Sequence, residues 1–229
     1  MRIRQLFDYE TWSYTYLLWD ENSKQAALID PVIEQVERDM SLVKELGLDL
    51  KYLMETHIHA DHITGGGEIR RRLGGEIVVH RNANIECANH LVDEGAVFTL
   101  GGQTIEIMHT PGHTNTDITY VTNQAIFTGD TLLVRDCGRT DFQSGSTEAL
   151  YQSLTQKIFQ LPDDLIVFPA HDYKGFSQST IGEEKQFNHR VGAGKPYEEF
   201  ASIMDNLNLP KPRRIDIAVP GNLLCGEGK

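Results

Sequence analysis

Residues 56–65 of the chain read THIHADHITG and place His57, His59, Asp61 and His62 within six positions. On an extended segment, side chains two residues apart point the same way, so His57 and His59 can face one point. The chain then turns at the glycines that follow, which can bring Asp61 and His62 back over that point. Neutral imidazole and carboxylate groups suit a first-row divalent metal ion. The spacing therefore predicts a metal site, in preference to chance histidines in a polar loop.

Three further residues that can bind a metal follow segments typical of strands. His113 comes after the Pro-Gly turn of HTPGHTNTD, Asp130 ends the segment AIFTGD, and His171 ends LIVFPAH. Loops that leave a rigid scaffold are where functional sites are commonly built. With the cluster after residue 56, four strand-to-loop junctions carry candidate ligands, which strengthens the prediction of a metal site.

The elements that must hold these side chains alternate between strands and helices. β-rich segments bounded by turn residues predict strands at 13–19, 24–30, 50–56, 76–80, 96–100, 104–110, 117–122, 125–130 and 165–171. Helical apolar spacing with Pro or Gly near the ends predicts helices at 32–47, within 65–75, and at 147–160, 181–190 and 197–207. A Pro-rich tail follows. This order predicts two sheets covered by helices.

Composition and charge exclude several classes of protein. Of the 229 residues, 40% are hydrophobic and 24% are charged, so the chain can bury a core and is not intrinsically disordered. The net charge of −12 argues against a nucleic-acid partner, because a binder of nucleic acid normally carries a basic surface. No run of 18 apolar residues occurs, so no membrane span is predicted.

The cysteines bear on the compartment. Cys87, Cys137 and Cys225 are far apart and odd in number, which argues against a disulfide framework and favours a reducing compartment. The first residues lack the apolar core of a secretory signal. We therefore expect a cytoplasmic protein, or an organelle form that has lost its transit peptide.

The motifs HIHADH, PGHT, GD and AHD together resemble those of the metallo-β-lactamase superfamily. The resemblance implies an α/β fold, a four-layer αββα sandwich of two mixed β-sheets flanked by helices. It also implies a single domain over 1–229, with a short helical C-terminal segment, about 177–229, that packs near the active site. The longer stretches ETHIHADHITGGG, FTGDTLLVRDCGRTDFQSGS and NLNLPKP are similar to those of persulfide dioxygenases, the iron enzymes that oxidise glutathione persulfide.

The ligand set leaves the number of metal ions open. In dinuclear relatives, His57, His59 and His113 would hold one ion, and Asp61, His62 and His171 the other, with Asp130 as the bridge. The resemblance to persulfide dioxygenases implies instead one Fe(II) per chain, held by His57, His113 and Asp130. His59, Asp61, His62 and His171 would then orient these ligands and line the pocket.

Two histidines and one carboxylate leave coordination positions open, as in non-haem iron oxygenases. The resemblance implies that the substrates are glutathione persulfide and O₂ and that the products are sulfite and glutathione. It further implies a rhodanese-type sulfurtransferase as a partner and a monomer or homodimer. The expected partners include neither nucleic acid nor a membrane.

Residues near the ligands are candidates for substrate binding. Arg139 could pair with a glutathione carboxylate through its forked donors, or tie its loop to Asp136 or Asp141. Tyr173, just past His171, could bond the substrate or pack in the core.

Four weaker candidates complete the predicted site. Thr140 and Asn222 are expected at the pocket. Cys137 is expected to line the pocket or to be a buried, inert thiol, and Cys225 to be a modulatory thiol or a bystander.

Three other functions compete with the dioxygenase. The nearest is a glyoxalase II-like hydroxyacylglutathione hydrolase with a dinuclear metal site, which shares the ligand set. A nucleic-acid-processing hydrolase of the same fold is disfavoured by the net charge of −12. A metal-binding sensor without catalysis is disfavoured because structural metal sites tend to be closed by protein ligands.

Overall fold

Two six-stranded sheets organise the computed structural model, which describes residues 1–227. The first has the order β1-β2-β3-β4-β5-β6 and comprises Arg2–Asp8, Ser13–Trp19, Gln25–Ile29, Asp49–Met54, Glu76–His80 and His90–Val92. The second has the order β12-β11-β10-β9-β8-β7; in chain order, β7 to β12 are Val97–Leu100, Gln103–His109, Ile118–Val121, Ala125–Phe127, Ile166–Phe168 and Ser179–Thr180. Each sheet contains parallel and antiparallel pairs, so both are mixed.

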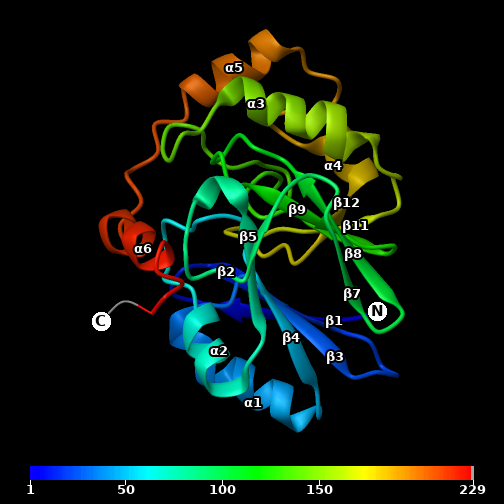
Figure 1. The fold of residues 1–229 in the computed structure, drawn as a ribbon. Helices are drawn as coiled ribbons and strands as arrows, with labels where there is room; N and C mark the ends of the chain where they lie inside the picture. Colours follow the sequence, from blue (N-terminus) through cyan, green and yellow to red (C-terminus); the bar gives the residue numbers. More distant parts are fainter. Residues whose placement is uncertain (228–229) are drawn as a thin grey trace.

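Helices cover the outer faces of both sheets (Figure 1). α1 (Val36–Glu45) and α2 (Gly66–Leu73) lie on the first sheet. α3 (Thr147–Gln152), α4 (Ile181–Phe187) and α5 (Tyr197–Asp205) lie on the second. The short helical turns are η1 (Ile33–Gln35), η2 (Arg81–Ala83), η3 (Ser153–Lys157) and η4 (Ile158–Gln160). This arrangement confirms the predicted α/β fold of four layers.

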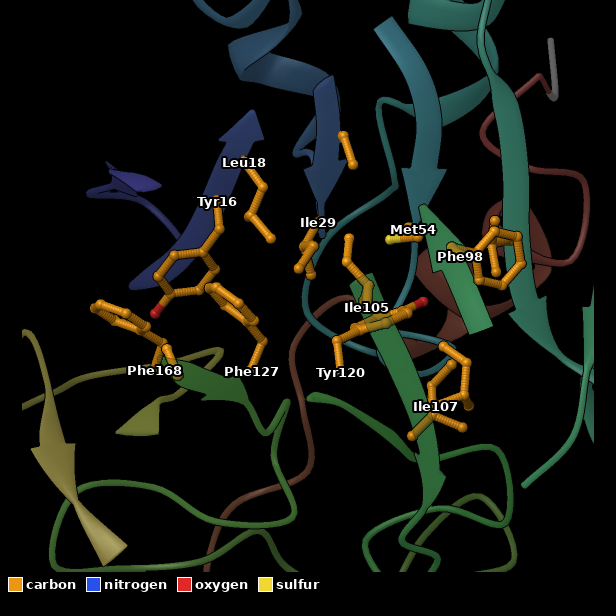
Figure 2. Packing of buried hydrophobic residues seen from close by; sticks show 14 of the residues in the cluster. Tyr16, Leu18, Ile29, Met54, Phe98, Ile105, Ile107, Tyr120, Phe127 and Phe168 are labelled. Atoms are coloured by element: carbon orange, nitrogen blue, oxygen red, sulfur yellow. The ribbon is translucent and has the colours of Figure 1, made fainter. Parts of the chain in front are cut away.

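The main core lies between the two sheets (Figure 2). Tyr16 of the first sheet packs on Phe127 of the second, with ring centroids 5.0 Å apart. The buried hydroxyl of Tyr16 donates to the carbonyl of Pro169 over 2.6 Å, and that of Tyr120 donates to the carbonyl of Glu55 over 2.7 Å. Because each large side chain buried in this way contributes roughly 1.5–3 kcal/mol, the core fixes the two sheets face to face and thereby fixes the loops at their edge.

Several elements differ from those predicted. The sequence pattern missed β1, β6 and β12, which are edge strands of the two sheets. The helix predicted at 147–160 divides into α3, a π-helical turn and a 3₁₀ turn. The Pro-rich tail contains α6 (Ile215–Asn222), whose Pro220 lies inside the helix. No helix in the described part of the chain combines the length and apolar character that a membrane crossing requires.

The cysteine prediction is wrong in one respect. Cys87 and Cys225 form a disulfide that joins residues 138 positions apart, whereas Cys137 is free and buried. Disulfide pairing depends on the distance between Cα atoms in the folded chain, 6.1 Å here, and the chain separation says little about it. The C-terminal turn after α6 returns to α2 and brings Cys225 to Cys87. The last two residues of the predicted domain, 228 and 229, lie outside the described residues.

Candidate metal centre

Three ligand-capable side chains converge at one edge of the sandwich. His57 follows β4 of the first sheet, whereas His113 and Asp130 follow β8 and β10 of the second. One ligand atom from each of the three lies within 4.8 Å of the others. The Nε2 atom of His113 is 3.5 Å from Oδ2 of Asp130. The tertiary structure thus gathers three of the seven predicted ligand candidates into one compact group, which we call the ligand triad.

The orientation of His57 is set by its neighbours. The Thr56 hydroxyl donates to Oδ2 of Asp30 over 2.7 Å, because a carboxylate can only accept. The same hydroxyl oxygen lies 3.0 Å from Nδ1 of His57 and can accept the proton of that nitrogen. This arrangement leaves the lone pair of His57 on Nε2, the nitrogen that faces the pocket. Burial, together with the neighbouring His59, holds the pKa of His57 well below its ordinary value, so the ring is neutral.

His113 is oriented by the backbone. Its Nδ1 donates to the carbonyl oxygen of Arg139 over 2.7 Å. A neutral imidazole that donates through Nδ1 carries its lone pair on Nε2, the nitrogen that faces Asp130. Two imidazole Nε2 atoms and one carboxylate therefore face each other, and this donor set fits a first-row divalent ion.

Asp130 is held by His171. Oδ1 of Asp130 lies 2.7 Å from Nδ1 of His171, and Oδ2 of Asp61 lies 3.0 Å from the other ring nitrogen. Burial alone would lower the pKa of His171, but Asp130, Tyr173 and Asp61 hold it well above its ordinary value. Burial would likewise raise the pKa of Asp130, but His171 and His113 hold it well below. The imidazolium of His171 thus leaves Oδ2 of Asp130 as the carboxylate oxygen for a metal.

The remaining candidates form a second group beside the triad, which we call the acid-paired group: His59, Asp61, His62 and His171. His59 is buried and its Nε2 lies 3.1 Å from Asp30 and 3.6 Å from Glu55. Nδ1 of His62 lies 3.0 Å from Asp61. His59, Asp61 and His62 also place ligand atoms within 4.8 Å of one another, so the donors present permit one ion or two.

The triad opens onto a cavity of about 430 Å³. Tyr173 lies at the mouth with 62% exposure, and its ring stacks on His171 at a centroid distance of 5.8 Å. Cys137 lines the same cavity and is buried beside Met204. Burial raises the pKa of the Cys137 thiol to about 12, so it is protonated and unreactive near neutral pH.

Arg139 lies at the cavity wall, but its donors already have partners. The guanidinium forks onto Asp141, with Nε···Oδ1 and Nη2···Oδ2 distances of 2.6 and 2.7 Å. It also donates to the carbonyl of Pro210 over 2.6 Å. The structure therefore supports the alternative that Arg139 ties its loop to Asp141. Through Pro210 it also holds the chain between α5 and α6, part of which lines the cavity.

Two predicted pocket residues lie elsewhere. Thr140 bonds the hydroxyl of Thr147 over 2.8 Å and is not among the residues that line the cavity. Asn222 is buried with 4% exposure and is also absent from the cavity wall. Its side chain accepts from the backbone of Thr64, so its observed place is behind the ligands instead of at the substrate side.

Comparison with known proteins is consistent with this geometry. Residues 12–171 match the model of the metallo-beta-lactamase superfamily. The persulfide dioxygenases ETHE1, mitochondrial, of Mus musculus and Homo sapiens are each 48% identical over 227 residues, which cover 98% of this chain and 88% of theirs. The crystal structure of ETHE1 from Myxococcus xanthus has a TM-score of 0.96 and 51% identity, over 99% of this chain and 100% of that one. The chain belongs to the persulfide dioxygenase family.

This member of the persulfide dioxygenase family contains site residues that the sequence pattern did not single out. Asp30 and Thr56 orient His57, and the only sequence signal was their place at a strand end and beside a histidine. Arg190 lines the cavity, where it pairs with Asp136 and donates to the carbonyl of Cys137 over 2.6 Å. Its segment reads as an ordinary helix end, so no local pattern could have placed it.

Proposed function

We propose that the protein is an Fe(II)-dependent dioxygenase that converts glutathione persulfide, O₂ and water into glutathione and sulfite. The observation that carries the proposal is the ligand triad, two imidazoles and one carboxylate that open onto a cavity. The match to proteins named persulfide dioxygenase, over 98% of the chain, supports the same activity.

The donors fit one iron ion per chain. When bound by His57, His113 and Asp130, Fe(II) supplies open coordination positions and the redox chemistry that O₂ activation requires. Support for a single ion comes from His171, since Asp130 and Asp61 already occupy both of its ring nitrogens.

The protein side chains position the substrate and hold charge. The His171 imidazolium balances Asp130 and Asp61, so the carboxylates remain ionised within a partly closed site. Arg139 and Arg190 lie in the cavity wall, where each is paired with a carboxylate, Asp141 and Asp136, and so holds the wall in place. Tyr173 places an exposed hydroxyl at the mouth, where it can donate to substrate. In the overall reaction both atoms of O₂ end on the terminal sulfur of the persulfide, and water then cleaves the S–S bond: its oxygen goes to sulfite, and the glutathione sulfur leaves and takes up a proton as the thiol.

A hydroxyacylglutathione hydrolase is the second candidate and has less support. The hydrolase GloC of Haemophilus influenzae is 34% identical over 195 residues, which cover 75% of this chain. That activity would require a second ion between the triad and the acid-paired group, because it relies on a dinuclear site. The rhodanese-type partner, the monomer or homodimer and the cytoplasmic location stay predictions; the mouse and human relatives bear the word mitochondrial in their names.

The test is O₂ consumption by protein that is loaded anaerobically with Fe(II) and then given glutathione persulfide. We expect one sulfite for each O₂ consumed and one iron per chain by elemental analysis of iron, zinc and manganese. Zinc-loaded protein is the matched control, because zinc has no redox chemistry for O₂. O₂ uptake no greater than that of the zinc form, or two ions per chain with thioester hydrolysis, would contradict the proposal.

A further inference from the structure

The disulfide joins the C-terminal turn to the segment between β5 and β6. The same turn lies against residues 57–64, which we call the metal loop, through Asn222. Cys225 lies three residues after Asn222, in the turn that follows α6. The carbonyl of Cys225 accepts from the backbone nitrogen of Gly67 over 2.9 Å. A Cβ at Gly67 would lie 2.5 Å from that carbonyl oxygen, so only glycine permits this approach. The turn therefore packs directly on the first residues of α2.

Asn222 connects this turn to the metal loop. Its Oδ1 accepts from the backbone nitrogen of Thr64 over 2.7 Å. Its Nδ2 donates to the carbonyls of His59 and His62, each over 2.9 Å. All three bonds are buried, and together they fix the path of the loop that begins at His57 and carries the acid-paired histidines.

The disulfide is accessible from one side and can close again. Cys87 is partly exposed, whereas Cys225 is buried with 2% exposure. Arg70 donates to the carbonyl of Cys87 over 2.6 Å and pairs with Glu227 over 2.6 Å, so it bonds both segments that the disulfide joins. These contacts would keep the two cysteines near each other after the bond opens.

We propose that Cys87–Cys225 is a site of reversible exchange with low-molecular-weight thiols, and that its opening loosens the metal loop. A thiolate attacks the exposed sulfur of Cys87, a mixed disulfide forms there, and Cys225 leaves as a thiolate that takes up a proton. A second thiol then attacks the mixed disulfide and releases Cys87 as a thiol. The net result is that two thiols are oxidised to one disulfide while the two cysteines are reduced.

The exchange rests on the proposed function in one respect, the identity of the thiol. The reaction proposed above releases glutathione, so a reductant of this class is present wherever the enzyme works. The loosened loop would lower both retention of the ion and turnover as the product thiol accumulates.

The experiment compares the wild type with Cys87→Ser, each as metal-free full-length protein before and after treatment with glutathione. Amide hydrogen exchange is followed in 57–67 and, for comparison, in β8 and β9. In the wild type, we expect reduction to speed exchange in 57–67 on the order of tenfold while β8 and β9 change little. Cys87→Ser should show the fast rate in both conditions. Alkylation after reduction should label Cys87 and Cys225 and spare Cys137, which is buried with a pKa raised to about 12.

Three results would overturn the proposal. These are slow exchange in reduced wild type, equal acceleration of all strands, or acceleration by glutathione in Cys87→Ser. Release of iron to a chelator from the loaded protein is the second readout, and it should accelerate with the same dependence on Cys87. Because amide exchange is measured without metal or substrate, it tests whether the Cys87–Cys225 disulfide holds the metal loop even if the dioxygenase proposal fails.

Discussion

The ligand triad and the acid-paired group contain the same residue types yet differ in what each ring faces. In the triad, Nδ1 of His57 and Nδ1 of His113 are taken by uncharged oxygens of the protein, so each ring turns Nε2 toward the cavity. In the acid-paired group, His59 faces Asp30 and His171 lies between Asp130 and Asp61.

The difference teaches that a histidine's role follows from the partner of its second nitrogen. In this site an uncharged acceptor at Nδ1 leaves Nε2 of the two triad histidines for a metal, whereas carboxylates at both ring nitrogens of His171 favour the imidazolium, which cannot bind one. The pKa directions follow this rule, since burial holds the pKa of His57 low while burial of His59 is outweighed by Asp30 and Glu55, which raise its pKa. All three triad residues line the cavity, together with Asp61 and His171, whereas His59 and His62 are not among its lining residues.

Removal of the triad carboxylate should have the largest effect, because the triad would then no longer differ from the acid-paired group in its ability to bind a metal. Asp130→Ala deletes the one anionic donor of the triad, so we expect iron content near zero and a loss of turnover of at least about a thousandfold. Elemental analysis and O₂ uptake measure the two effects. The matched control is Asp141→Ala, which removes the carboxylate that pairs with Arg139 and lies outside the triad. This variant should keep its iron. Full iron content in Asp130→Ala would show that Asp130 is not a ligand.

Asn222 supports the loop that carries the acid-paired group, because it bonds the backbone on either side of Asp61. Asn222→Ala would leave the carbonyls of His59 and His62 and the amide of Thr64 without partners in a buried place. We expect a loss of about 3 kcal/mol in the free energy of unfolding, measured from the shift in denaturant midpoint at unchanged slope. A shift below about 0.5 kcal/mol would mean that water replaces these bonds at little cost.

Thr56 tests the comparison because its hydroxyl stands between the Asp30 carboxylate and His57, so that Nδ1 of His57 faces an uncharged oxygen instead of a carboxylate. Thr56→Val removes the hydroxyl that accepts from Nδ1, whereas Thr56→Ser keeps it. We expect the valine variant to bind iron about 10–100-fold more weakly, and the serine variant to stay near the wild type. Equal affinities for the two variants, from chelator competition, would remove the hydroxyl from the account.

A histidine outside both groups gives the smallest expected effect. His80 is buried against His109 at a ring distance of 3.9 Å, and burial followed by His109 lowers its pKa to about 4. The unfolded chain binds a proton at this residue near pH 6.5, so between pH 6.5 and 4 the unfolded state holds more protons. The free energy of unfolding should therefore fall by about 2 kcal/mol as pH drops through this window, and be fully present above it.

Unfolding curves of His80→Gln at several pH values check this expectation. The variant should lose most of that slope, whereas the control His90→Gln, at the surface beside Glu76, should keep it. Identical pH slopes for wild type and His80→Gln would place the titration elsewhere.

Much of the architecture was predictable. Apolar residues identified the central strands, such as β3 and β4, because most of the residues in each are apolar. Edge strands carry polar residues and pair through backbone bonds, so β1 and β12 left little trace in the pattern. α6 was missed because Pro220 lies within it and its apolar periodicity is weak.

The residues of the site were predictable, but the long-range contacts that hold them were not. The seven ligand candidates were identified from residue type and their place at strand ends. The pairing of Cys87 with Cys225 and the position of Asn222 behind the loop join segments more than 130 residues apart. Such contacts depend on how the C-terminal turn packs against α2, and no local signal encodes it.

By itself, the sequence determined which donors the protein carries and that each would emerge from a strand end, since both follow from residue type and local periodicity. Only the tertiary structure decided which imidazoles keep a free lone pair, because that depends on Asp30, on the carbonyl of Arg139 and on Asp61, which reach the histidines from other strands and loops. The same packing placed the triad at a cavity and buried His59 beside it.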